Sequence, residues 1–197
     1  MEGKFGPGRL VLDIIGNKID WVLAPSEDPS LWKEEKLPPN VGLFAETRDD
    51  FVKTISRWLV STLPVVRLAF GARLMMPVAD KEEAYRQLSS YLPFTLDEKN
   101  SSDFNYQINR PRKSRVLGED LRINRLMKWT PMWFRTIAGI PQAKTSVTIQ
   151  SSHICFLELD INTDAEIEKP LPEKDLLDVF RELVDLANEI AEKGDIP

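Results

Sequence analysis

The sequence predicts an α+β domain in which a mainly antiparallel sheet is covered on one face by about three amphipathic helices. Two patterns lead to this prediction. Apolar residues alternate with polar ones in several short segments, as in half-buried strands, and they recur every three or four positions in three longer segments, as in surface helices. The length of 197 residues fits one domain spanning 1–197.

The first predicted element is a β-hairpin at residues 10–23. Apolar residues hold every second position on both sides of Gly16-Asn17. A two-residue interruption of this kind is typical of a primed turn between antiparallel strands. Four prolines then fall within residues 24–40, which predicts a loop.

Two helices and two strands are expected next. Thr47 is the predicted N-terminal cap of the first helix, and Asp80 with Glu83 forms a capping signature for the second. Alternating apolar residues predict strands at residues 65–76 and 104–108.

The second half of the chain adds strands of higher Val, Ile and Thr content. Residues 121–134 are apolar and basic without a clear period, which predicts a strand followed by a turn at Pro131. Residues 143–150 and 153–161 are predicted to form a second hairpin.

A long amphipathic helix is predicted at residues 173–193, ended by Gly194. Its wide apolar face has two interpretations. It packs on the sheet of its own domain, or it forms a seam for a second copy or another subunit.

Composition argues against several classes of protein. Cys155 and His153 are the only residues of their types, so an intrachain disulfide and a Cys/His zinc site within one chain are excluded, and a reduced, cytoplasmic setting is expected. The opening residues lack the apolar core of a signal peptide. Residues 58–78 are apolar, but Arg67 and Arg73 would be costly in a bilayer, so no membrane span is expected.

The motifs of the common enzyme classes are missing: there is no Gly-rich phosphate loop and no Gly-x-Ser-x-Gly elbow. His153 and Cys155 would share an apolar strand face, which favours packing over catalysis. Glu158 and Asp160 would lie on the opposite face, as a solvated pair or as ligands for Mg²⁺. We expect no catalytic residue, metal or cofactor.

The charge is distributed unevenly along the chain, whose formal net charge is -5. Residues 104–137 contain eight basic and two acidic residues, whereas residues 156–197 contain four basic and thirteen acidic ones. The basic stretch also contains the aromatic residues Tyr106, Trp129, Trp133 and Phe134, a composition that suits phosphates and unpaired bases. Its candidate nucleic-acid-binding residues are Arg110, Arg112, Lys113, Arg115, Arg122, Arg125 and Lys128. The alternative is that the acidic C-terminal helix neutralises these arginines within the molecule.

Five tryptophans are a further signal, because tryptophan next to arginine is typical of interface anchors. Trp32, Trp129 and Trp133 fall in segments of poor periodicity, where burial in the chain's own core is least assured. We therefore take these three as candidate interface residues.

The order of short motifs resembles a known group of proteins. These motifs are Val65-Val-Arg-Leu-Ala-Phe-Gly, Ile123-Asn-Arg-Leu and Phe156-Leu-Glu-Leu-Asp-Ile before a terminal helix. The chain resembles a sporadically distributed bacterial protein family of uncharacterised function, whose members end in a Leu-Asp-Ile-Asp strand and an amphipathic helix. The resemblance implies a role beside a bacterial defence system.

Taken together, these features predict a non-enzymatic accessory protein that docks a protein partner or itself. The alternative is a nucleic-acid-binding subunit that uses the basic and aromatic stretch at residues 104–137.

Overall fold

Over the residues that the structure describes, the chain folds as an α+β protein with antiparallel sheets of three and five strands and three α-helices. The structure is a computed structural model that describes residues 1–27, 37–59, 64–138, 148–164, 166 and 169–195. It separates two compact units, Met1–Ser61 (unit 1) and Thr62–Pro197 (unit 2), where the sequence predicted one domain and one sheet. Among the described residues, no helix combines the length and the apolar character needed to span a bilayer.

Unit 1 is a three-stranded meander with one helix. Its elements are β1 (Glu2–Phe5), β2 (Gly8–Ile15), β3 (Lys18–Pro25) and α1 (Phe44–Leu59). The predicted hairpin is confirmed, because Ile15 pairs with Lys18 around the two-residue turn and Gly16 adopts the positive φ of 61° that such a turn requires.

The helix of unit 1 begins earlier than predicted. Thr47 is not its cap but lies in its first turn, where its N–H donates to the carbonyl of Leu43 at 3.0 Å. The predicted loop at residues 24–40 is described in part: β3 continues to Pro25, residues 37–40 have no regular structure, and residues 28–36 lie outside the described residues.

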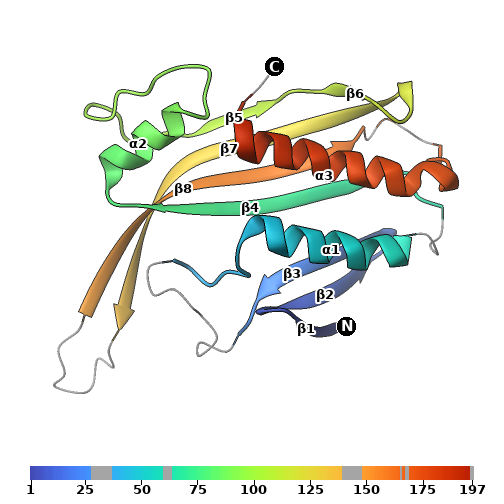
Figure 1. The fold of residues 1–197 in the computed structure, drawn as a ribbon, viewed down its shortest axis with the longest axis horizontal. Helices are drawn as coiled ribbons and strands as arrows, with labels where there is room; N and C mark the ends of the chain where they lie inside the picture. Colours follow the sequence, from blue (N-terminus) through green and yellow to red (C-terminus); the bar gives the residue numbers. More distant parts are fainter. Residues whose placement is uncertain (28–36, 60–63, 139–147, 165, 167–168, 196–197) are drawn as a thin grey trace. The chain divides into compact units, whose positions relative to one another are not determined.

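Unit 2 is built on the five-stranded sheet, with the strand order β4-β8-β7-β5 and with β6 also pairing with β7 (Figure 1). The strands are β4 (Ala69–Val78), β5 (Tyr106–Asn109), β6 (Arg112–Ser114), β7 (Gly118–Ala138) and β8 (Thr148–Thr163). All pairs are antiparallel, and β7 and β8 share sixteen consecutive residue pairs.

Two helices cover one face of this sheet (Figure 1). They are α2 (Lys81–Ser89) and α3 (Leu176–Lys193), the latter preceded by a short 3₁₀ turn, η2 (Glu173–Asp175). The capping signature of α2 is confirmed: Asp80 accepts from the N–H of Glu83 at 2.8 Å, and Glu83 accepts from the N–H of Ala79 at 2.6 Å. The apolar face of α3 is buried in its own unit, and it includes Leu176, Val179, Phe180, Leu183, Ala187 and Ile190.

The predicted second hairpin is wrong. Residues 148–163 form one uninterrupted strand, and Ser151 and Ser152 lie inside it rather than in a turn. The polar pair resembled an interruption in the sequence, but the backbone continues because β8 pairs with β7 along its whole length.

The predicted turn at Pro131 is also absent, because β7 passes through this position. Residues on a strand point their N–H groups alternately to either side. The carbonyl of Arg122 accepts from the N–H of Asp164, just after β8, and the carbonyl of Arg125 accepts from the N–H of Arg110 on the opposite side. Pro131 is an even number of positions from Arg125, so its backbone faces the same side as that of Arg125. Its nitrogen therefore faces a side on which β5 has already ended at the Tyr106–Trp129 pair, and the missing N–H removes no bond of the described ladder.

The ends of β7 and β8 extend beyond their neighbours as a two-stranded arm (Figure 1). Its pairs run from Phe134 with Ser152 to Ala138 with Thr148. At the base of the arm, Trp133 pairs with His153, and His153 also pairs with Val78, the last residue of β4. We refer to residues 134–138 and 148–152 as the arm.

Candidate interaction site

The basic stretch meets the acidic C-terminal helix, as the alternative interpretation of the charge pattern anticipated. Arg110 forms two hydrogen bonds with the carboxylate of Asp195, from Nε at 2.8 Å and from Nη2 at 2.9 Å. The hydroxyl of Tyr106 donates to the same carboxylate at 2.6 Å. This group joins β5 and the residue that follows it to the end of α3.

The electrostatics of this group follow from its geometry. Asp195 has a fully buried side chain, and the hydrogen bond from Arg110 holds the pKa of its carboxyl below the ordinary value of 3.8 against the opposing effect of burial. Burial, followed by the hydrogen bond to Asp195, raises the pKa of Tyr106. A carboxylate with a lowered pKa stabilises the folded state while it is ionised.

Asp195→Asn is expected to lower the unfolding free energy at pH 7 by about 2 kcal/mol, because it removes charge-assisted hydrogen bonds from a buried site. The folded pKa is lowered, so the contribution of Asp195 is present above the unfolded pKa and is lost as the pH falls through the folded pKa. Urea unfolding at pH 7 and pH 3 should show the difference between wild type and variant shrinking at pH 3. An unchanged difference would contradict this assignment, and Asp178→Asn, at an exposed surface pair, is the control.

A second contact joins two arginines to Glu189 of α3. Arg112 donates to Glu189 at 3.0 Å, and Nη2 of Arg125 lies 4.0 Å from the same carboxylate. Arg125 is 0% exposed, and burial together with the charge of Arg112 lowers its pKa. Arg125 is therefore part of the packing between β7 and α3, and the prediction that it binds nucleic acid is corrected.

A third contact fixes the turn between β6 and β7. Glu182 of α3 is only 3% exposed, and it accepts from the hydroxyl of Ser114 and from the N–H of Arg115, both at 2.6 Å. The guanidinium of Arg115 also lies 3.1 Å from Asp185. Ser114 completes the turn by accepting from the N–H groups of Val116 and Leu117 at 3.1 and 3.2 Å.

The seven predicted basic residues therefore do not form one free patch. Lys113 pairs with Glu119 at the exposed turn. Arg122 and Lys128 lie on the sheet face opposite α3, and in the described part of the chain no ion pair is found for either of them. The arginines nearest α3 are occupied by its carboxylates.

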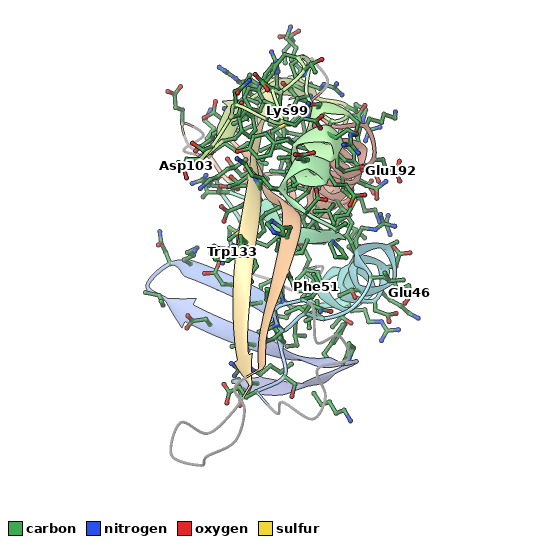
Figure 2. All side chains as sticks on the ribbon, turned by 90° about the vertical axis from the view of Figure 1, so that its left-hand side faces the viewer. Glu46, Phe51, Lys99, Asp103, Trp133 and Glu192 are labelled. Atoms are coloured by element: carbon green, nitrogen blue, oxygen red, sulfur yellow. The ribbon has the colours of Figure 1, made fainter. Side chains whose placement is uncertain are left out.

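The candidate interface tryptophans that the structure describes lie in different environments. Trp129 is 3% exposed and stacks on Tyr91 with ring centroids 5.1 Å apart, so it belongs to the core and the interface prediction for it is corrected. Trp133, four positions further along β7 and labelled in Figure 2, is 51% exposed. Trp32 lies outside the described residues.

The remaining candidate chemical groups sit as the strand alternation predicted. Cys155 is buried, its thiol donates to the carbonyl of Ala84 at 3.3 Å, and burial raises its pKa to about 11, so it is a packed and unreactive thiol at neutral pH. On the other face, Glu158 pairs with Arg73 at 3.0 Å and Asp160 accepts from Asn162 at 2.8 Å. Within the described ranges, no group of three or more His, Cys, Asp or Glu side chains is placed to hold a metal ion.

The main feature that sequence reasoning missed is the arm. A signal was present, because no acidic residue occurs between Asp120 and Glu158. The helix-side face of β7 and β8, buried under α2 at Trp129 and Cys155, continues to the base of the arm. There it presents a row of Val78, His153 and Trp133, which we call the aromatic row.

Comparison with protein-family models, with curated proteins and with solved structures finds no match for this chain.

Proposed function

We propose that this protein is a non-enzymatic interaction protein that docks a protein partner, or a further copy of itself, at the aromatic row and the arm. The observation that carries this proposal is the 51% exposure of Trp133 beside the half-buried His153 and Val78, at the point where the arm leaves the sheet. A large, partly exposed aromatic side chain is a typical anchor for a protein interface. The family resemblance supports placing this interaction beside a bacterial defence system.

The distribution of charge also supports a protein partner over nucleic acid. Arg112 and Arg115 contact carboxylates of α3, Arg110 contacts Asp195 two residues after α3, and Arg125 is buried. A protein that binds a phosphate backbone offers cations at its surface, and binding then weakens steeply with salt. Of the predicted nucleic-acid-binding residues, Arg122 and Lys128 on the face opposite the helices remain available to contact phosphates.

The proposal is tested by affinity capture from a native-host lysate with tagged wild type and tagged Trp133→Ala, each with and without nuclease. We expect a specific protein to be retained by the wild type in both lysates and to be depleted at least about tenfold with Trp133→Ala, as for the loss of an interface anchor. Arg122→Glu/Lys128→Glu is the matched control and should retain the partner. Retention that is independent of Trp133 would contradict the proposal. Retention that disappears with nuclease and with the charge-reversal variant would favour nucleic acid.

A further inference from the structure

The arm leaves one side of β8 without a neighbouring strand in the described residues. On this side β8 pairs with β4, and the last pair is Val78 with His153. Residues 148–152 continue with β7 on their other side only. The open edge is therefore a short stretch in line with β4.

The backbone groups that face this edge follow from two hydrogen bonds. The N–H of Thr163 donates to Leu68, just before β4, at 2.9 Å, and the N–H of Asp164 donates to Arg122 of β7 at 2.9 Å. Odd-numbered residues of β8 thus point their backbone groups toward the β4 side, and the register with β7 continues without a shift to Thr148. In the arm, Ile149 and Ser151 direct their N–H and C=O groups to the open edge.

Two other edges of this sheet carry residues that disfavour the addition of a strand. The outer edge of β4 has Pro77, and the outer edge of β7 has Pro131 and Arg135. Prolines and charges are the usual protection of an edge strand. Residues 145–157, which include the open edge of β8, contain no proline and no Asp, Glu, Lys or Arg.

We propose that the open edge of β8 pairs with the same edge of a second copy of this chain, forming a two-fold dimer through an antiparallel β8–β8 ladder. This inference rests on the proposed function and names the partner. With Ile149 opposite Ser151 of the partner subunit, each N–H faces a C=O, and Gln150 lies opposite its own equivalent. The register is self-complementary, as a two-fold interface requires.

A second copy fits this edge better than a charged partner does. The edge carries no charge, so two copies meet without repulsion, and a strongly acidic or basic segment would find no counterpart along it. A two-stranded ribbon is marginally stable on its own, whereas pairing of two arms makes a four-stranded sheet.

The register is tested by disulfide trapping in the full-length protein. Gln150→Cys should give a covalent dimer on non-reducing gels under mild oxidation, because directly opposed residues of a non-hydrogen-bonded pair lie about 4.5 Å apart between Cα atoms, within the range of a disulfide. Ser152→Cys is the matched control. In this register position 152 of one copy would lie about 13 Å from that of the other, so Ser152→Cys should give no covalent dimer on the non-reducing gel. No dimer with Gln150→Cys, or equal trapping of both variants, would overturn the proposal.

The edge is tested by sedimentation velocity over concentrations up to about 200 μM, a range that detects micromolar association. Wild type and Ser151→Ala, which keeps the N–H, should form dimers at high concentration, whereas Ser151→Pro should be at least about tenfold weaker. Ser151→Pro removes an N–H that faces away from β7, so its circular dichroism should match that of the wild type. A wild type that is monomeric throughout would overturn the dimer, and Trp133-dependent capture of another protein would still support the proposed function.

Discussion

Trp129→Ala is expected to lower the unfolding free energy of unit 2 by about 3–5 kcal/mol, whereas Trp133→Ala should lower it by less than about 1 kcal/mol. The two side chains come from one strand and have the same chemistry. They differ in environment, because Trp129 is 3% exposed and stacked on Tyr91 while Trp133 is 51% exposed. Truncating the first leaves a cavity in the core of unit 2, whereas about half of the surface of the second is already in solvent.

Urea denaturation followed by far-ultraviolet circular dichroism checks this pair, because it does not depend on the fluorescence of the residue removed. The small loss of stability expected for Trp133→Ala should leave this variant folded in the capture experiment, so a loss of capture would report the lost contact. Comparable destabilisation by both substitutions would contradict the core and surface assignments on which the proposed function depends.

Gly194→Ala is expected to lower the unfolding free energy by about 3 kcal/mol or more, although it replaces only one hydrogen atom with a methyl group. Gly194 ends α3 with φ 80° and ψ -153°, a conformation that is essentially restricted to glycine. A Cβ at this position would lie 2.2 Å from the carbonyl oxygen of Tyr91 and 2.6 Å from its Cα. The neighbouring N–H of Asp195 donates to that carbonyl at 2.8 Å, so the backbones cannot separate without breaking this bond.

Gly118→Ala provides the matched control for this prediction. Gly118 has a positive φ of 58°, but no atom lies within 4 Å of the position of a new Cβ. Its substitution should cost only the conformational strain, about 1 kcal/mol. Thermal unfolding of the two variants separates strain from steric overlap, and equal shifts in melting temperature would show that the close approach to Tyr91 is not important.

Local signals in the sequence predicted the local parts of the fold well. The turn at Gly16-Asn17, the capping box of Asp80 with Glu83 and the end of α3 at Gly194 each depend on a few adjacent residues, and all three are confirmed. The fold class follows from the same periodicities. The start of α1 was misplaced because Thr47 is a good cap in isolation, although the helix begins three residues earlier.

The errors concern strands, whose boundaries depend on distant partners. Pro131 is compatible with a strand only because β5 ends two residues earlier on its neighbouring side. Ser151 and Ser152 remain in a strand only because β7 accompanies them. Prediction of the candidate site had the same limit, because composition alone does not show whether the arginines face solvent or α3. It also could not distinguish buried Trp129 from exposed Trp133.

The position of β8 in the sheet has a consequence for how the chain is made. Unit 1 is a meander whose strands pair with near neighbours in sequence, so it can form while the rest of the chain is still being synthesised. In unit 2, Ala69 of β4 cannot pair with Asn162 until β8 has been synthesised. β8 lies between β4 and β7 in the sheet and is translated after both of them. Such long-range pairing delays folding. The nascent β4 is therefore left exposed on the ribosome for several seconds, at typical rates of about 5–20 residues per second.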